Sequence, residues 1–161
     1  MLQSNEGGIL ATVGASPARR IFAYGVIFGL GALLIYTTLV QPPALGWLIF
    51  MLAFGGSMIV LAEKLRRATT SLLYLTEEGL CDEHGKVLAT FDQMVSISRG
   101  AFAMKPSNGF TLVLSERVPR AWAPGLWWRL GRRVGVGGVT SAGQTKFMAE
   151  QIAQRISARD K

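Results

Sequence analysis

The stretch IFAYGVIFGLGALLIYTTLV, residues 21–40, contains twenty consecutive residues without a charged side chain. As a helix it would be about 30 Å long, which matches the hydrocarbon core of a bilayer. A second uncharged stretch, ALGWLIFMLAFGGSMIVLA at residues 44–62, follows after the tripeptide QPP. Proline stops one helix and starts the next, and so short a connection makes the two helices antiparallel. The sequence therefore predicts a transmembrane hairpin that, with its flanks, covers residues 19–67.

Basic residues flank this hairpin at both outer ends, whereas its connection has none. Arg19 and Arg20 precede the first stretch, and Lys64, Arg66 and Arg67 follow the second. By the positive-inside rule we expect an integral, multi-pass protein of the inner (plasma) membrane with both termini in the cytoplasm. The first stretch is about twice as long as the apolar region of a signal peptide, so we expect no cleavage. Neither stretch contains an ionisable residue typical of an ion or proton pathway.

Glycines recur along both apolar stretches. Gly25 and Gly29 have GxxxG spacing, and Gly55 and Gly56 lie in the second stretch. Small residues allow helix backbones to approach closely. Two interpretations stay open: the helices of the hairpin pack against each other through these four glycines, or the glycines mediate dimerisation or docking onto a larger membrane protein.

The ionisable residues exclude several functional classes. The 161 residues include one cysteine, Cys81, so no internal disulfide or CxxC motif is available. The single histidine, His84, reduces the number of catalytic and metal sites that the chain can build. The run Asp82-Glu83-His84-Gly85 is interpreted as a solvated turn, because adjacent residues seldom converge on one metal ion. The GxxxxG spacing at residues 138–143 has Gln144 where a phosphate loop needs lysine. We therefore expect no enzyme, no catalytic residue, no cofactor and no bound metal.

After Arg67 the sequence changes to short apolar runs separated by turn residues, which is typical of antiparallel sheets. A soluble mixed domain is predicted at residues 71–161, after a flexible tail at residues 1–18. An amphipathic helix is predicted at residues 145–159, with Phe147, Met148, Ile152 and Ile156 at helical spacing. Turns are predicted at residues 82–85 and 105–109, and strands at residues 72–75, 80–81, 86–90, 92–98, 110–114 and 134–139.

This order of elements, antiparallel hairpins and one terminal helix directly after a two-helix hairpin with basic flanks, resembles the bacterial membrane-anchored PH-like proteins. The most family-like stretches are LTEEGL at residues 75–80 and the terminal helix. The resemblance implies an α+β membrane protein, with a small antiparallel PH-like β-barrel that the C-terminal helix caps. It also implies a non-enzymatic binding or scaffolding role. No basic signature of the phosphoinositide-binding relatives is matched, so it implies no lipid specificity.

The most unusual stretch is RVPRAWAPGLWWRLGRR, residues 117–133, which we call the Arg/Trp segment. No Asp or Glu occurs from residue 117 to residue 149. Guanidinium groups pair with phosphate, and indole rings favour the membrane interface. Three interpretations are open: contact with anionic headgroups, contact with a protein partner, or tryptophans in the core beside solvated arginines. The candidate contact residues are Arg117, Arg120, Trp122, Trp127, Trp128, Arg129, Arg132 and Arg133.

The functional expectation is a membrane-tethered scaffold whose domain contacts membrane lipids at the inner leaflet. The alternative is an accessory or assembly subunit of a larger inner-membrane complex, with a membrane-protein partner or a second copy on the glycine-rich helices. We expect no nucleic acid as a partner, because the net charge of +7 comes without a recognised binding motif. The sequence identifies no small-molecule substrate.

Overall fold

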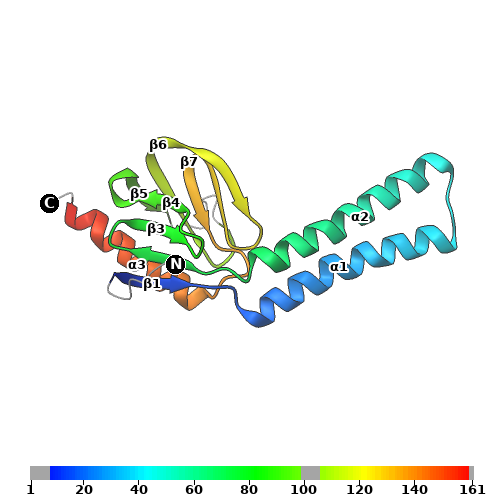
Figure 1. Ribbon diagram of the computed structural model, residues 1–161, viewed down its shortest axis with the longest axis horizontal. Helices are drawn as coiled ribbons and strands as arrows, with labels where there is room; N and C mark the ends of the chain where they lie inside the picture. Colours follow the sequence, from blue (N-terminus) through cyan, green and yellow to red (C-terminus); the bar gives the residue numbers. More distant parts are fainter. Residues whose placement is uncertain (1–7, 99–105, 160–161) are drawn as a thin grey trace. The chain divides into compact units, whose positions relative to one another are not determined.

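The computed structural model describes residues 8–98 and 106–159 (Figure 1). The chain divides into two compact units. One unit is residues 17–67, which we call the helical hairpin, and the other combines the segments before and after it, which we call the β domain. Residues 1–7 of the predicted tail and Lys105 of a predicted turn lie outside the described residues.

The helical hairpin consists of α1 (Pro17–Val40) and α2 (Leu45–Ala68). Within the described residues, these are the two helices that are long and apolar enough to cross a membrane. The α1 helix begins at Pro17, where a missing N–H costs nothing and the fixed φ suits the first turn. Most large apolar side chains of both helices are exposed, Phe22 and Leu45 among them. The hairpin therefore leaves its apolar surface uncovered by its own packing.

The two helices meet closely at Gly31 and Gly55. A Cβ atom at Gly31 would lie 2.9 Å from the Gly55 carbonyl oxygen, and one at Gly55 would lie 2.8 Å from Cγ1 of Ile35. Of the four glycines predicted to pack helices, only Gly55 does so here. Cβ positions at Gly25, Gly29 and Gly56 have no heavy atom within 4 Å. At about 100° per residue, Gly25 and Gly29 lie well over 90° around α1 from Gly31, which takes them off the contact line.

The β domain contains two antiparallel sheets and one helix (Figure 1). The first sheet has the order β1 (Ile9–Val13), β2 (Leu73–Thr76), β3 (Gly79–Asp82) and β4 (Val87–Thr90). The second has the order β5 (Met94–Ser98), β6 (Phe110–Ala123) and β7 (Trp127–Val136). The short 3-10 helix η1 (Phe91–Gln93) connects the sheets, and α3 (Ala142–Arg159) packs against β1, β5 and β6.

Strand β1 lies in the stretch that the sequence analysis placed in a flexible tail. Val13 pairs with Leu73 of β2, and both side chains are fully buried. Beyond the strand, the Ser16 N–H donates a hydrogen bond to the Val139 carbonyl at 2.8 Å. The strand has no partner nearby in the sequence, so its short apolar run gave no hairpin signal. The helical hairpin is consequently inserted between two neighbouring strands of one sheet.

The predicted β-barrel, capped by the C-terminal helix, is wrong because the two sheets do not close into a barrel, whereas the mixed α+β class is confirmed. Within the described residues, no strand of the first sheet pairs with a strand of the second, and β4 and β7 are edge strands of the two sheets. Instead, Nη1 of Arg129 on β7 donates a hydrogen bond to the Val87 carbonyl on β4 at 2.8 Å. The two sheets are thus connected here by a side chain of β7 rather than by backbone hydrogen bonds between strands.

The hydrophobic core lies between the two sheets and α3. Its largest fully buried side chains include Phe110 and Leu112 of β6 and Met148 and Ile152 of α3. The predicted amphipathic face of α3 is buried except for Phe147, which is 50% exposed. Alternating apolar positions in the strands and helical spacing in α3 therefore serve one core.

Candidate functional site on the β6 and β7 hairpin

The Arg/Trp segment forms the end of β6, a tight turn at residues 124–126 and most of β7. Strand β6 extends to Ala123, nine residues beyond the predicted end at Leu114. Trp122 pairs with Trp128 across the hairpin, and Ala123 pairs with Trp127. Because side chains alternate along a strand, this register separates the segment into two faces.

Arg120, Trp122, Trp128 and Leu130 occupy even-numbered positions on what we call the outer face. Ala121, Ala123, Trp127 and Arg129 occupy what we call the inner face.

Trp127 on the inner face belongs to the core. Its side chain is 5% exposed. Lys86 Nζ lies 5.3 Å and Arg129 Cζ 5.9 Å from the Trp127 ring centroid, so two cations cover the indole. Trp127 and Arg129 were both candidates for membrane or partner contact, but here they stabilise the fold. Arg129 does so by bridging from β7 to Val87 of β4.

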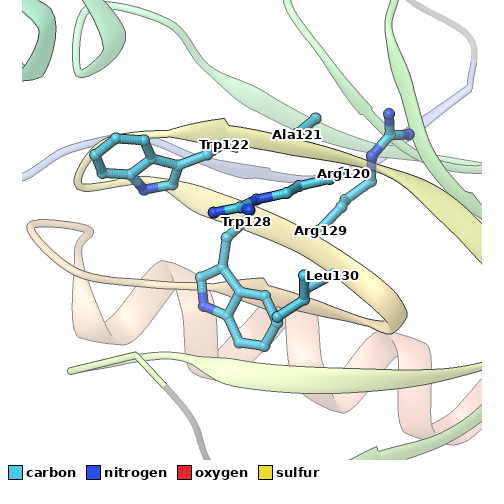
Figure 2. A pocket seen from close by; sticks show the side chains of 6 residues that line it. All are labelled: Arg120, Ala121, Trp122, Trp128, Arg129 and Leu130. Atoms are coloured by element: carbon cyan, nitrogen blue, oxygen red, sulfur yellow. The ribbon is translucent and has the colours of Figure 1, made fainter.

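The outer face carries the exposed aromatic and apolar side chains. Trp122 is 60% and Leu130 57% exposed. Together with Arg120, Ala121, Trp128 and Arg129, they line a cleft of about 600 Å³. Figure 2 shows the Arg120 side chain extending toward the two indoles, whereas Arg129 points away to the other side of the hairpin. The cleft therefore combines two indoles, one aliphatic side chain and one guanidinium.

Trp128 is half-buried because its indole lies over Gly135 of the same strand. Any Cβ atom at Gly135 would overlap the Trp128 ring. Seven residues of straight strand would separate the two positions by about 23 Å, so the strand must bend. The register shifts around Val118, together with a positive φ of 58° at Gly131, provide the irregularity that allows this bend.

The other three arginines of the segment, Arg117, Arg132 and Arg133, have exposed side chains. No acidic residue occurs between positions 117 and 149, so the segment supplies no carboxylate of its own to neutralise them. The Arg/Trp segment by itself is consequently cationic.

Sequence reasoning identified the segment but missed two residues of the site. Leu130 extends the apolar lining of the cleft, and Gly135 makes room for the Trp128 indole. Leu130 has an even-numbered position, as Trp122 and Trp128 do. This position places it on the same face as the two tryptophans only when the register between β6 and β7 is known. Nothing in the local sequence pairs Gly135 with Trp128.

The glycines of the 135–138 stretch support close backbone contacts. Gly137 and Gly138 have φ angles of 145° and 122°. A Cβ atom at Gly137 would lie 2.8 Å from the Gly109 Cα, and one at Gly138 would lie 2.7 Å from the Gly125 carbonyl oxygen. This stretch therefore packs backbone against backbone beside the hairpin turn.

The turn at residues 82–85 is held by Asp82, whose Oδ1 accepts hydrogen bonds from the backbone N–H groups of His84 and Lys86. Among the described residues, no three His, Cys, Asp or Glu side chains are grouped as a metal ion requires. Burial raises the pKa of the Cys81 thiol, which keeps it protonated and weakly nucleophilic near neutral pH.

Comparison of the chain with protein-family models, with curated proteins and with solved structures gives no significant match.

Proposed function

We propose that the chain is a membrane-anchored, non-enzymatic binding module that presents the outer face of the β6 and β7 hairpin to anionic headgroups at the inner leaflet. One observation carries the proposal: two indoles, Leu130 and Arg120 lie together on a surface that the domain core does not use. Indole and guanidinium are the side chains that suit the boundary between hydrocarbon and phosphate.

The anchor is the helical hairpin. The length and apolar character of α1 and α2 support insertion into a bilayer, and their exposed apolar faces favour lipid over water. Arg19 and Arg20 before the apolar run, and Lys64 near the end of α2, favour a cytoplasmic location for both chain ends. The β domain would then face the leaflet that carries anionic lipid.

Tethering strengthens weak contacts of this kind. Each arginine near an anionic leaflet contributes about 1 kcal/mol before screening. Arg117, Arg120 and Arg132 together would contribute about 3 kcal/mol on that scale. A domain joined to membrane helices is already at high local concentration beside the lipid, so binding of this strength is sufficient.

The resemblance to membrane-anchored PH-like proteins is part of this proposal. Apart from β1, which precedes the helical hairpin, the antiparallel strands followed by a C-terminal helix keep the order of elements that suggested it. Such a fold suits a binding or scaffolding role, although the role itself rests on the site.

A vesicle-binding experiment tests the proposal. The linked β domain joins residues 8–16 through a short Gly/Ser linker to residues 68–161. The linker is feasible because Val13 at the end of β1 pairs with Leu73 at the start of β2. In this antiparallel pair the two chain ends to be joined therefore lie at the same end of the strands. We expect Arg120→Gln to weaken binding to vesicles with 30% phosphatidylglycerol about fivefold, the equivalent of about 1 kcal/mol. Co-sedimentation at several salt concentrations gives the measurement.

The matched control is Lys146→Gln, which removes one exposed positive charge from α3. It is expected to change vesicle binding by less than twofold. Wild-type binding that is absent, or that does not weaken as salt is added, would contradict the proposal.

The second candidate function is an accessory subunit of a larger membrane complex. One specific observation favours it. Gly25, Gly29 and Gly56 have open space over their Cα atoms and do not take part in the contact between α1 and α2. Extraction in mild detergent tests it. A stoichiometric large assembly that Gly29→Leu disrupts would support this function, and isolated monomers or dimers would favour the lipid-contact module.

A further inference from the structure

We propose that the outer-face cleft holds one anionic phospholipid molecule, with the phosphate on Arg120 and the first part of an acyl chain against Trp122, Trp128 and Leu130. This inference rests on the proposed function and makes it more specific. General adsorption needs only a cationic surface, whereas a cleft that holds one lipid selects that lipid from its neighbours.

The cleft has the composition that a phospholipid requires. Its volume of about 600 Å³ lies within the usual range of small-molecule pockets. Trp122 and Trp128 are directly paired across the hairpin, so their indoles stand on the same side of the strands. Leu130 continues this apolar surface along β7, and Arg120 brings the charge.

Arg120 is available for a phosphate group. Its side chain is exposed, and it has no hydrogen-bond or ion-pair partner within the part of the chain that the structure describes. Arg129, which also lines the cleft, donates its Nη1 hydrogen bond to Val87. A guanidinium group can donate two parallel hydrogen bonds to one phosphate, and Arg120 is the lining residue free to do so.

One wall of the cleft is fixed before any ligand enters. Trp128 lies against Gly135, and the bent strand keeps its indole there. Trp122 forms the opposite wall and is 60% exposed. A site with one fixed wall loses less conformational freedom on binding than a surface whose side chains are all mobile.

The occupant is a membrane lipid for two reasons. A free phosphate ion would engage Arg120 but would leave Trp122 and Leu130 exposed to water. The β domain is also joined through β1 and β2 to two helices of membrane-spanning length, so lipid is the ligand at the highest local concentration. An acidic peptide with apolar residues would satisfy the same side chains, and the experiment below separates it.

The experiment uses the full chain in nanodiscs of phosphatidylcholine with 20% phosphatidylglycerol. Bromine atoms near the headgroup end of the acyl chains quench indole fluorescence on contact. They are placed on an equal mole fraction of either lipid in separate samples. Trp47→Phe removes the exposed indole of α2 from the signal, and the further change Trp122→Phe defines the part of the signal that Trp122 contributes.

We expect brominated phosphatidylglycerol to quench Trp122 at least twofold more than brominated phosphatidylcholine. Arg120→Gln should reduce this ratio to about one. Arg132→Gln is the charge-matched comparison. Arg132 is exposed in the same segment but does not line the cleft, so its loss should lower the ratio less than the loss of Arg120 does. Gly135→Ala should also lower the ratio by displacing Trp128, whereas Gly143→Ala, which has open space on α3, should leave it unchanged.

Three results would overturn the inference. Equal quenching by both lipids means that the β6 and β7 hairpin lies at the membrane but that its cleft does not select one lipid. This result leaves the proposed function intact. An equal loss of the ratio in Arg120→Gln and Arg132→Gln means that diffuse charge alone selects the lipid. Absence of quenching by either lipid removes the proposed function as well and assigns the cleft to a protein partner.

Discussion

Trp127→Ala is expected to lower the free energy of unfolding of the β domain by about 3–5 kcal/mol, the usual cost of emptying a buried aromatic site. The indole is 5% exposed, and Lys86 and Arg129 both lie over its ring. Chemical denaturation of the linked β domain, followed by circular dichroism, measures the change.

Trp122→Ala is the matched control, since it removes the same side chain from the outer face of the same hairpin. We expect it to change the free energy of unfolding by less than about 1 kcal/mol, as for most surface substitutions, while vesicle binding falls. Equal destabilisation by the two variants would contradict the assignment of the two faces.

Val13→Asp is expected to prevent cooperative folding of the β domain. Val13 is fully buried against the core, and a carboxylate placed there would have no partner. An unpaired buried charge typically costs about 3–5 kcal/mol or more, which is comparable to the whole stability of a small domain. Thermal unfolding of the linked β domain measures the effect.

Ile9→Asp is the control on the same strand, because Ile9 is 47% exposed. It should leave cooperative unfolding in place. A fragment of residues 68–161 that lacks β1 should likewise fail to unfold cooperatively. If that fragment matches the linked β domain in stability, β1 does not belong to the fold.

The sequence predicts local structure well where the signals are local. The apolar runs around the tripeptide QPP give α1 and α2, and Asn108 in its positive-φ conformation supports the turn expected before Phe110. Strand β1 and the part of β6 beyond Leu114 were missed because the local sequence indicates neither. The partner of β1 is far along the chain, and Pro119 with two arginines makes the second half of β6 look like a loop in the sequence.

The same limit applies to the candidate site. Composition selects the Arg/Trp segment, but the fate of each tryptophan depends on the register between β6 and β7. A slip of one residue would exchange the two faces and bury Trp128 in place of Trp127. The same holds for the arginines. Arg129 and Arg120 both belong to the Arg/Trp segment and look alike in the sequence, yet Arg129 donates a hydrogen bond to Val87 between the two sheets.

We propose that the outer face of the β6 and β7 hairpin touches membrane lipid in the anchored protein. Photocrosslinking of the full chain in nanodiscs with 20% phosphatidylglycerol tests it most directly. Benzoylphenylalanine replaces Trp122, which is 60% exposed, in one sample and Phe147, a 50% exposed aromatic residue on α3, in the other. We expect lipid adducts at position 122 and none at position 147. Absence of lipid adducts at position 122, or equal yields at the two positions, would contradict it.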